Sequence, residues 1–275
     1  AIVEVSNYSI LPFERKEQIL RGSKDFEELP TAVRFYHEQE GLSLLPSGDI
    51  HKVLPTPFII TSSTGKLQID NSWFIQYDPS LEQEAGFLEK KLTALTGTQF
   101  SKGTASQSGK QIQLRKGNIS VDNKKDEAYS LRMSDNTISI TASQAAGAFY
   151  GIQSLLALIP ANAYLTTTSS FEIDKVQIDD APRFAFRGLH MDVSRNFQTK
   201  ETILKTLDVM AFYKLNHFLF YTTEDEGWRL EIEDLPELTE VGAQREHTRS
   251  MHDPVLHPAY GSGPFAYAKD RHGSG

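Results

Sequence analysis

The sequence predicts two fold classes in succession: an α+β small domain (an antiparallel sheet with two helices), then the first βαβ part of a (β/α)8 TIM barrel. Hairpin-like strands alternate with two helices of apolar period between residues 55 and 178. A polar, proline-marked boundary follows at residues 179–182. After it come a strand, an amphipathic helix and an apolar strand, which is the order of a right-handed parallel crossover.

The elements of the α+β domain, residues 53–178, follow from local patterns. Residues 73–77 are rich in β-formers and predict a strand. The next helix begins at Ser80 and ends at Gly97, and its apolar residues recur at helical period, namely Leu81, Ala85, Leu88, Leu92 and Leu95. The remaining elements are expected to be strands at 111–115, 128–133, 137–141 and 171–178, with a second helix at 143–159 ended by Pro160. Residues 1–52 show little periodicity and are interpreted as a linker or as the tail of an upstream domain.

The second predicted domain comprises residues 179–275. Its first strand is expected at about 186–193, Thr199 is expected to cap the helix, and its second strand is expected at 216–222. The active site of such a barrel lies at the carboxyl ends of the strands. Polar residues follow both strands. The rest of the chain is rich in Gly, Pro and His and is expected to form a long loop.

Composition narrows the function classes. A net charge of −8 argues against a nucleic-acid partner, because phosphate binding needs a basic surface. No apolar run approaches the ~20 residues that span a bilayer. The absence of cysteine excludes disulfides and thiolate chemistry and leaves the redox compartment open. The histidines lack metal-ligand spacing, so we expect no metal and no cofactor.

Three motifs together carry a resemblance to a known family. Residues 187–197 read RGLHMDVSRNF, residues 210–216 read MAFYKLN, and residues 225–229 read DEGWR, with PELTEVG soon after. These motifs and their spacing resemble the family 20 glycoside hydrolases, the β-N-acetylhexosaminidases, and the last two are similar to the bacterial chitobiase type. Residues 127–160 resemble the small domain that precedes the barrel in this family. The resemblance implies that residues 1–52 are the tail of an upstream carbohydrate-binding-like domain.

The resemblance implies roles for individual residues. Arg187 is expected to hold sugar hydroxyls, since a planar guanidinium offers paired donors, and Asp225 is expected to orient other catalytic groups. Four residues are expected to support the site: Asp192, Arg195, Glu224 and Trp228. On a regular strand Arg187 faces away from Asp192, so its substrate role requires irregular backbone at Gly188.

Structural alternatives remain open for these residues. Arg187 could form a salt bridge with Asp192 or a neighbour, and Asp192 could form a structural ion pair with Arg195. The three consecutive carboxylates at 224–226 could be a solvated turn or a fortuitous cation site. Trp228 could stack on a sugar or pack under the following loop.

Two departures from the family bear on activity. The resemblance implies substrate-assisted retaining catalysis, in which an Asp-Glu pair after the fourth strand orients the acetamido group and protonates the leaving oxygen. The His-x-Gly-Gly-Asp-Glu motif that carries this pair is absent, and the Asp-Glu dipeptides at 126–127 and 225–226 stand elsewhere. We therefore expect no catalytic residue in this chain and place the pair downstream. Residues 218–221 read FLFY where the family has two histidines, which predicts altered activity or specificity.

The expected function is part of an exo-acting β-N-acetylhexosaminidase that hydrolyses terminal N-acetylhexosamine from chitooligosaccharides or glycans, with these 275 residues inactive alone. The expected partner is an N-acetylglucosamine-containing oligosaccharide, and another chain could complete the barrel. The alternatives are a non-catalytic carbohydrate-binding homologue and an interaction module. The family's substrates imply a periplasmic or secreted location.

Overall fold

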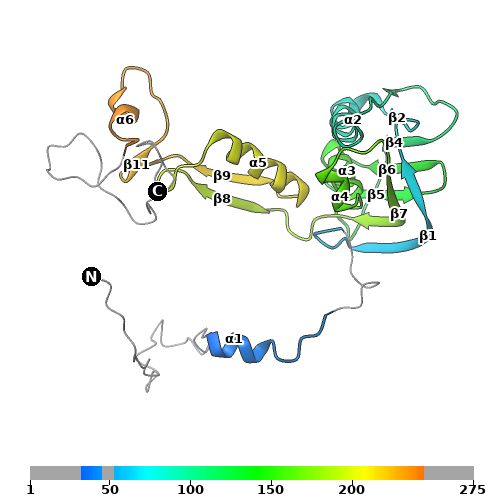
Figure 1. Cartoon of the computed structure of the whole chain (residues 1–275), viewed down its shortest axis with the longest axis horizontal. Coiled ribbons are helices and arrows are strands. Elements are labelled where there is room, and N and C mark those ends of the chain that lie inside the picture. The colour runs from blue at the N-terminus through cyan, green and yellow to red at the C-terminus, as the bar shows by residue number, and fades with distance from the viewer. Residues whose placement is uncertain (1–31, 45–52, 245–275) are drawn as a thin grey trace. The chain divides into compact units, whose positions relative to one another are not determined.

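The structure, a computed structural model, describes residues 32–44 and 53–244 (Figure 1). The chain divides into two units between residues 50 and 51. The described part of the first unit, residues 32–44, contains helix α1 (Ala32–Glu38), which buries no side chain. An ion pair of 2.6 Å joins Arg34 Nε to Glu38 Oε1 one turn later. Residues 1–31 and 45–52 of the segment predicted as a linker or tail lie outside the described residues.

A seven-stranded sheet forms the first part of the second unit, in the order β1-β7-β5-β6-β4-β2-β3. Its strands are β1 (Ile59–Ile69), β2 (Phe74–Tyr77), β3 (Lys102–Gly103), β4 (Gln111–Lys116), β5 (Tyr129–Met133), β6 (Thr137–Ala142) and β7 (Phe171–Asp180). Its helices are η3 (Pro79–Leu81), α2 (Glu82–Thr96), α3 (Ala145–Ala157) and the short α4 (Ala161–Leu165).

The prediction of an antiparallel sheet is wrong for three of the six strand pairings. β1, β7, β5 and β6 pair antiparallel, but β4 runs parallel to β6 and to β2, and β2 runs parallel to β3. The chain connects β2 to β3 and β4 through α2, and a helical crossover returns it to the end of the sheet where it started. β6 is parallel to β4 because the chain reverses direction twice between them, into β5 and out of it. β1 was not expected, since its polar run with Gly65 and an irregular register between Ser62 and Lys66 hides the alternation of a strand.

The core lies between the sheet and the helices. The predicted apolar stripe of α2 is confirmed, since Ala85, Leu88, Leu92 and Leu95 are all buried against the sheet residues. α3 is buried on most sides and approaches the sheet closely through two glycines. A Cβ at Gly147 would lie 2.4 Å from the carbonyl oxygen of Ala128.

A βαβ unit follows the sheet, with β8 (Gly188–Asp192), α5 (Lys200–Phe212) and β9 (His217–Tyr221). β8 and β9 pair in parallel. Thr199 caps α5 as predicted, because its Oγ1 accepts a hydrogen bond of 3.2 Å from Thr202 N. The short hairpin of β10 (Thr223–Glu224) and β11 (Gly227–Trp228) comes next, and the predicted long loop contains the one-turn helix α6 (Glu237–Glu240).

None of the helices within the described ranges is long and apolar enough to span a membrane.

The close approach of α3 to the sheet predicts opposite effects for two glycine substitutions. Gly147→Ala is expected to lower the free energy of unfolding by about 2 kcal/mol, because the added methyl meets backbone that must shift. Gly86→Ala in α2 is expected to raise it by up to about 1 kcal/mol, because nothing lies within 4 Å of the added Cβ and alanine favours a helix. Urea denaturation measures both, and stabilisation by both variants would contradict this packing.

Candidate functional site

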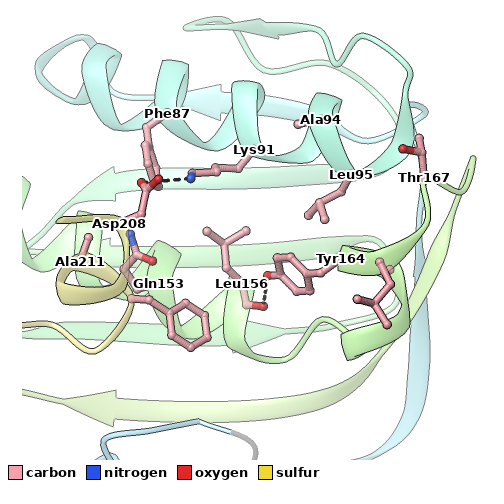
Figure 2. A pocket seen from close by; sticks show the side chains of 13 residues that line it. Phe87, Lys91, Ala94, Leu95, Gln153, Leu156, Tyr164, Thr167, Asp208 and Ala211 are labelled. Atoms are coloured by element: carbon pink, nitrogen blue, oxygen red, sulfur yellow. Dashed lines mark hydrogen bonds and ion pairs between the residues drawn. The ribbon is translucent and has the colours of Figure 1, made fainter. Parts of the chain in front are cut away.

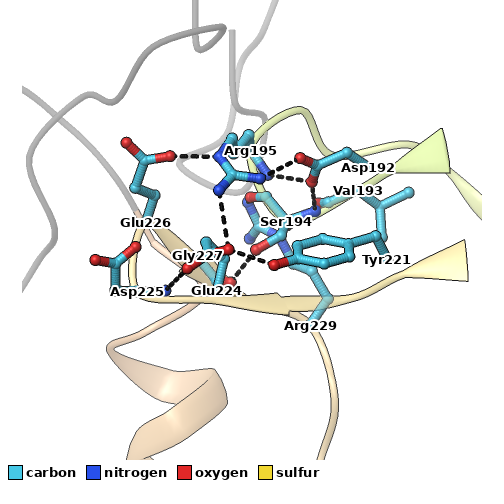
Figure 3. A network of polar contacts seen from close by, with 10 residues as sticks. All are labelled: Asp192, Val193, Ser194, Arg195, Tyr221, Glu224, Asp225, Glu226, Gly227 and Arg229. Carbon is cyan, nitrogen blue, oxygen red and sulfur yellow. Dashed lines mark hydrogen bonds and ion pairs between the residues drawn. The ribbon is translucent and has the colours of Figure 1, made fainter. Parts of the chain in front are cut away.

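The carboxyl ends of β8 and β9 lie side by side because the two strands are parallel and in register, with Asp192 opposite Tyr221. The backbone N–H of Val193 continues the pairing with a hydrogen bond of 3.0 Å to Tyr221 O. The chain then turns through Ser194 and Arg195 after β8, and through the β10–β11 hairpin after β9. Figure 3 shows the polar side chains that both turns gather at this edge.

Arg195 is the centre of this group (Figure 3). Its Nη1 lies 2.6 Å from Asp192 Oδ2, and its Nη2 lies 2.9 Å from Glu224 Oε2. Its Nε lies 2.6 Å from Glu226 Oε2. We call these four residues the Arg195 cluster. One cation facing three carboxylates raises the pKa of Arg195, and the guanidinium is held in one orientation by partners on both strand ends.

Two carboxylates of the cluster, those of Asp192 and Glu224, have lowered pKa values. Partial burial alone would raise the pKa of Asp192, but hydrogen bonds from the backbone and side chain of Arg195 outweigh it and lower that pKa. The pKa of Glu224 falls to about 2, chiefly because the Tyr221 hydroxyl donates a hydrogen bond to its carboxylate. That bond in turn raises the pKa of Tyr221.

A second layer of contacts fixes the two turns beneath the cluster. The buried Ser194 hydroxyl donates to Gly227 O. Arg229 Nε donates to Val193 O at 3.1 Å, and its Nη1 donates to Ala243 O. Tyr221 and Arg229 are site residues that the sequence did not predict, and Glu226 was considered only as part of the carboxylate run at 224–226. The available signal was their position, at the end of a strand or within the DEGWR motif.

Asp225 and Trp228 flank the cluster. Asp225 is exposed at the tip of the hairpin, and its backbone N–H donates to Glu224 Oε1 at 3.2 Å. Trp228 Nε1 donates to Leu230 O at 2.6 Å, and its backbone N–H donates to Gly242 O at 2.9 Å. Trp228 therefore holds the loop that follows it, in agreement with the packing alternative.

Arg187 lies at the opposite end of β8, so the structure does not bring it together with Asp225. Its guanidinium is 14% exposed and contacts Glu127 Oε2 at 2.9 Å. It also donates to Tyr150 OH at 3.1 Å, and to three backbone carbonyl oxygens. Gly188 pairs in register with His217, so the irregular backbone that the substrate role needs is not seen there. The salt-bridge alternative describes this geometry, with Glu127 in place of Asp192.

Lys214 forms a second buried contact beside Arg187. The residue is 8% exposed, and its Nζ lies 2.9 Å from Asp180 Oδ2 and 2.8 Å from Tyr129 OH. Burial lowers the pKa of Lys214, and Asp180 opposes this effect. We call the Arg187–Glu127 and Lys214–Asp180 ion pairs the interface pairs, because they join the βαβ unit to the sheet domain.

The interface pairs make Lys214 a sensitive position for stability. Lys214→Met is expected to lower the free energy of unfolding by about 3 kcal/mol, because Asp180 would keep a buried charge without its cation. The double variant with Asp180→Asn is expected to recover part of that loss. Lys205→Met on the exposed face of α5 is the matched control and is expected to change little. Equal losses at both lysines in thermal denaturation would contradict the assignment.

The lowered pKa of Glu224 predicts a defined pH dependence. Its charge contributes stability that is complete above pH 4.5 and is lost as the pH falls toward about 2, because the folded-state pKa is below the ordinary one. Tyr221→Phe is expected to raise the pKa of Glu224 toward 4.5, and Tyr213→Phe is expected to leave it unchanged. Carboxyl ¹³C NMR titration measures this pKa. The same value with and without the Tyr221 hydroxyl would refute the stated cause.

Comparison with known families and proteins places this geometry in context. The model of the domain described as "Glycosyl hydrolase family 20, domain 2" matches residues 51–181, and that of the "Glycosyl hydrolase family 20, catalytic domain" matches residues 184–272. A beta-hexosaminidase of Vibrio vulnificus is 36% identical over 265 residues, which is 94% of this chain and 29% of that protein. An N,N'-diacetylchitobiase of Vibrio harveyi is 44% identical over 151 residues, which is 55% of this chain and 16% of that protein.

Solved structures give the same result. A GH20 exo β-N-acetylglucosaminidase from Vibrio harveyi in complex with N-acetylglucosamine matches with a TM-score of 0.61 and 30% identity, covering 70% of this chain and 29% of that one. A GH20 β-N-acetylhexosaminidase from Streptomyces coelicolor matches with a TM-score of 0.61 and 29% identity, over 71% of this chain and 39% of that one. The chain thus spans well under half the length of these relatives. With both of its family domains matched in the family's order, the chain belongs to glycosyl hydrolase family 20.

Proposed function

We propose that this chain is part of an exo-acting β-N-acetylhexosaminidase that removes terminal N-acetylhexosamine from chitooligosaccharides or glycans. The observation that carries the proposal is the Arg195 cluster, which gathers a guanidinium and three carboxylates at the carboxyl ends of two parallel strands. Family membership supplies the sugar class, since the relatives are named as hexosaminidases and a chitobiase. A periplasmic or secreted location belongs to the same proposal and rests on the family's substrates.

The β8–α5–β9 unit is the start of a TIM barrel in this proposal, within a second domain of residues 179–275 that follows the domain of residues 53–178. Parallel pairing supports it, as do three exposed apolar side chains on the two strands, Leu189, Leu219 and Phe220. Burial of apolar surface is worth about 25 cal/mol per Å². Further strands, from later sequence or from another chain, would bury these three side chains and so gain the free energy of apolar burial.

Arg195, in place of Arg187, is the arginine that we assign to the sugar hydroxyls. It lies at the end of the strands where barrel enzymes bind their substrates, and its side chain is 34% exposed. Arg187 lies at the amino end and is engaged by Glu127. Asp225, exposed at the same edge as Arg195, keeps its proposed role in orienting groups around the sugar.

In this proposal the residues of the chain bind and orient the sugar. The groups that break the glycosidic bond lie outside these 275 residues. In substrate-assisted catalysis the acetamido carbonyl oxygen attacks the anomeric carbon as the glycosidic oxygen leaves, and a glutamic acid donates the proton to that oxygen. The Asp-Glu pair that performs this step is proposed to lie in later sequence. The 275-residue chain is then expected to release no 4-nitrophenol from 4-nitrophenyl N-acetyl-β-glucosaminide, while a longer protein that includes it does.

Substitution of each arginine in that longer protein is expected to have a different effect. Arg195→Lys is expected to lower kcat/KM about 100-fold, because lysine cannot reproduce the directional donors of a guanidinium. Arg187→Lys is expected to lower the melting temperature and to leave kcat/KM within a few-fold of the parent. Release of 4-nitrophenol and calorimetry give the two readouts. The reverse pattern would return the substrate role to Arg187, and binding without turnover by the parent would favour the carbohydrate-binding alternative.

A further inference from the structure

A cavity of about 340 Å³ lies between α2, α3, α4 and α5 (Figure 2). None of the residues that line it belongs to the Arg195 cluster, so it is a separate feature of the molecule. Its volume is in the range of small-molecule sites in proteins.

The wall of this cavity is mostly aromatic and aliphatic. Phe87 and Phe212 contribute rings, and Leu95 and Leu156 contribute aliphatic groups. Tyr164 also lines it, and its hydroxyl is used inside the wall, where it donates to Leu156 O at 2.8 Å. Such a lining fits a ligand with an apolar face of about the size of one ring.

Gln153 supplies a donor that has no acceptor. The residue is 3% exposed, and its Nε2 has no hydrogen-bond partner in the described part of the chain. Figure 2 shows its side chain beside Asp208 and Ala211 on the α5 side of the cavity. A buried amide without an acceptor is costly and uncommon. Nε2 itself is buried, so a ligand oxygen in the cavity would satisfy it after a rotation of the side-chain amide toward the cavity.

The charged groups at the cavity cancel one another. Lys91 Nζ on α2 lies 3.4 Å from Asp208 Oδ1 on α5, and both side chains reach solvent. The ligand consequently needs no net charge. Ammonium and carboxylate groups together offer donors and acceptors to hydroxyl groups.

We propose that this cavity binds one N-acetylhexosamine unit outside the catalytic centre. A pyranose presents an apolar ring face to the aromatic wall, its acetamido carbonyl accepts from Gln153 Nε2, and its hydroxyls reach Lys91 and Asp208. The choice of an N-acetylated sugar over other pyranoses rests on the proposed function. Such a site would hold a second unit or strand of the polymer on the protein between catalytic events.

The test is a titration of the ¹⁵N-labelled 275-residue chain with N-acetylglucosamine, read at the side-chain amide signal of Gln153 in the parent chain and at the backbone amide signals of the lining residues Leu95 and Ala211 in every variant. We expect a saturable shift of these signals and affinity about tenfold weaker in Gln153→Met, which removes the donor and keeps the volume. The melting temperature should not fall, because the substitution breaks no hydrogen bond. Gln76→Met is the matched control, since Gln76 also has a buried unpartnered side-chain atom but does not line the cavity.

A second variant keeps the test decisive if Gln153→Met folds poorly. Ala94 is an exposed lining residue of α2, so Ala94→Phe should fill the cavity without disturbing the core and should abolish the shift. Glucose, which lacks the acetamido group, should bind about tenfold more weakly than N-acetylglucosamine. Unchanged affinity in Gln153→Met and Ala94→Phe, or no saturable shift in the parent chain, would overturn the proposal.

Failure of the cavity site and failure of the proposed function give different results. If the sugar occupies only the Arg195 cluster, Arg195→Lys removes binding and Gln153→Met does not, which overturns this site alone. If the Gln153 signal shifts while the longer protein has no hexosaminidase activity, the proposed function fails and the cavity site stands.

Discussion

The parallel register of β8 with β9 is the constraint on which the candidate site depends. Residues 188–192 pair with residues 217–221 without a break, and hydrogen bonds at both ends continue the pairing. Because the strands are parallel, everything that follows them meets at one edge and everything that precedes them meets at the other. A one-residue slip would turn Asp192 to the other face of the sheet and dismantle the Arg195 cluster.

The two ends of this register carry different chemistry. At the amino end, Arg187 and Lys214 are buried against Glu127, Asp180 and two tyrosines of the sheet domain. Buried charges of this kind fix geometry more than they add stability. At the carboxyl end, Arg195 is shared by three partly exposed carboxylates, so its guanidinium is oriented but still reaches solvent. The first arrangement suits an anchor, and the second suits recognition of a hydroxylated ligand.

The sequence predicted those features that depend on local periodicity. The stripe of α2, the Thr199 cap and the parallel pair of β8 and β9 are all observed. Strand direction in the sheet was not predictable from short apolar runs, because the parallel pairing of β4 with β2 depends on how the crossover through α2 places it.

The site was predictable in position but not in the assignment of each arginine. Both arginines stand in the same motif, and the predicted strand at 186–193 already places them at opposite ends, but the resemblance assigned the sugar to Arg187 at the amino end. Tyr221 stands at the end of the second strand where the resemblance implied a histidine, and its hydroxyl lowers the pKa of Glu224 to about 2. No alternation pattern reveals such a bond, because it depends on the turn geometry of the β10–β11 hairpin. The sequence likewise does not reveal that the side-chain amide of Gln153, in a mostly apolar helix, is buried with its Nε2 unpartnered.

The most direct measurement is a crystal structure of the longer protein with N-acetylglucosamine bound in its catalytic centre. We expect that the Arg195 guanidinium donates hydrogen bonds to sugar hydroxyls while Arg187 remains in contact with Glu127. A sugar held by Arg187, with Arg195 turned away from it, would contradict the assignment and with it the claim that the carboxyl ends of β8 and β9 form the substrate edge.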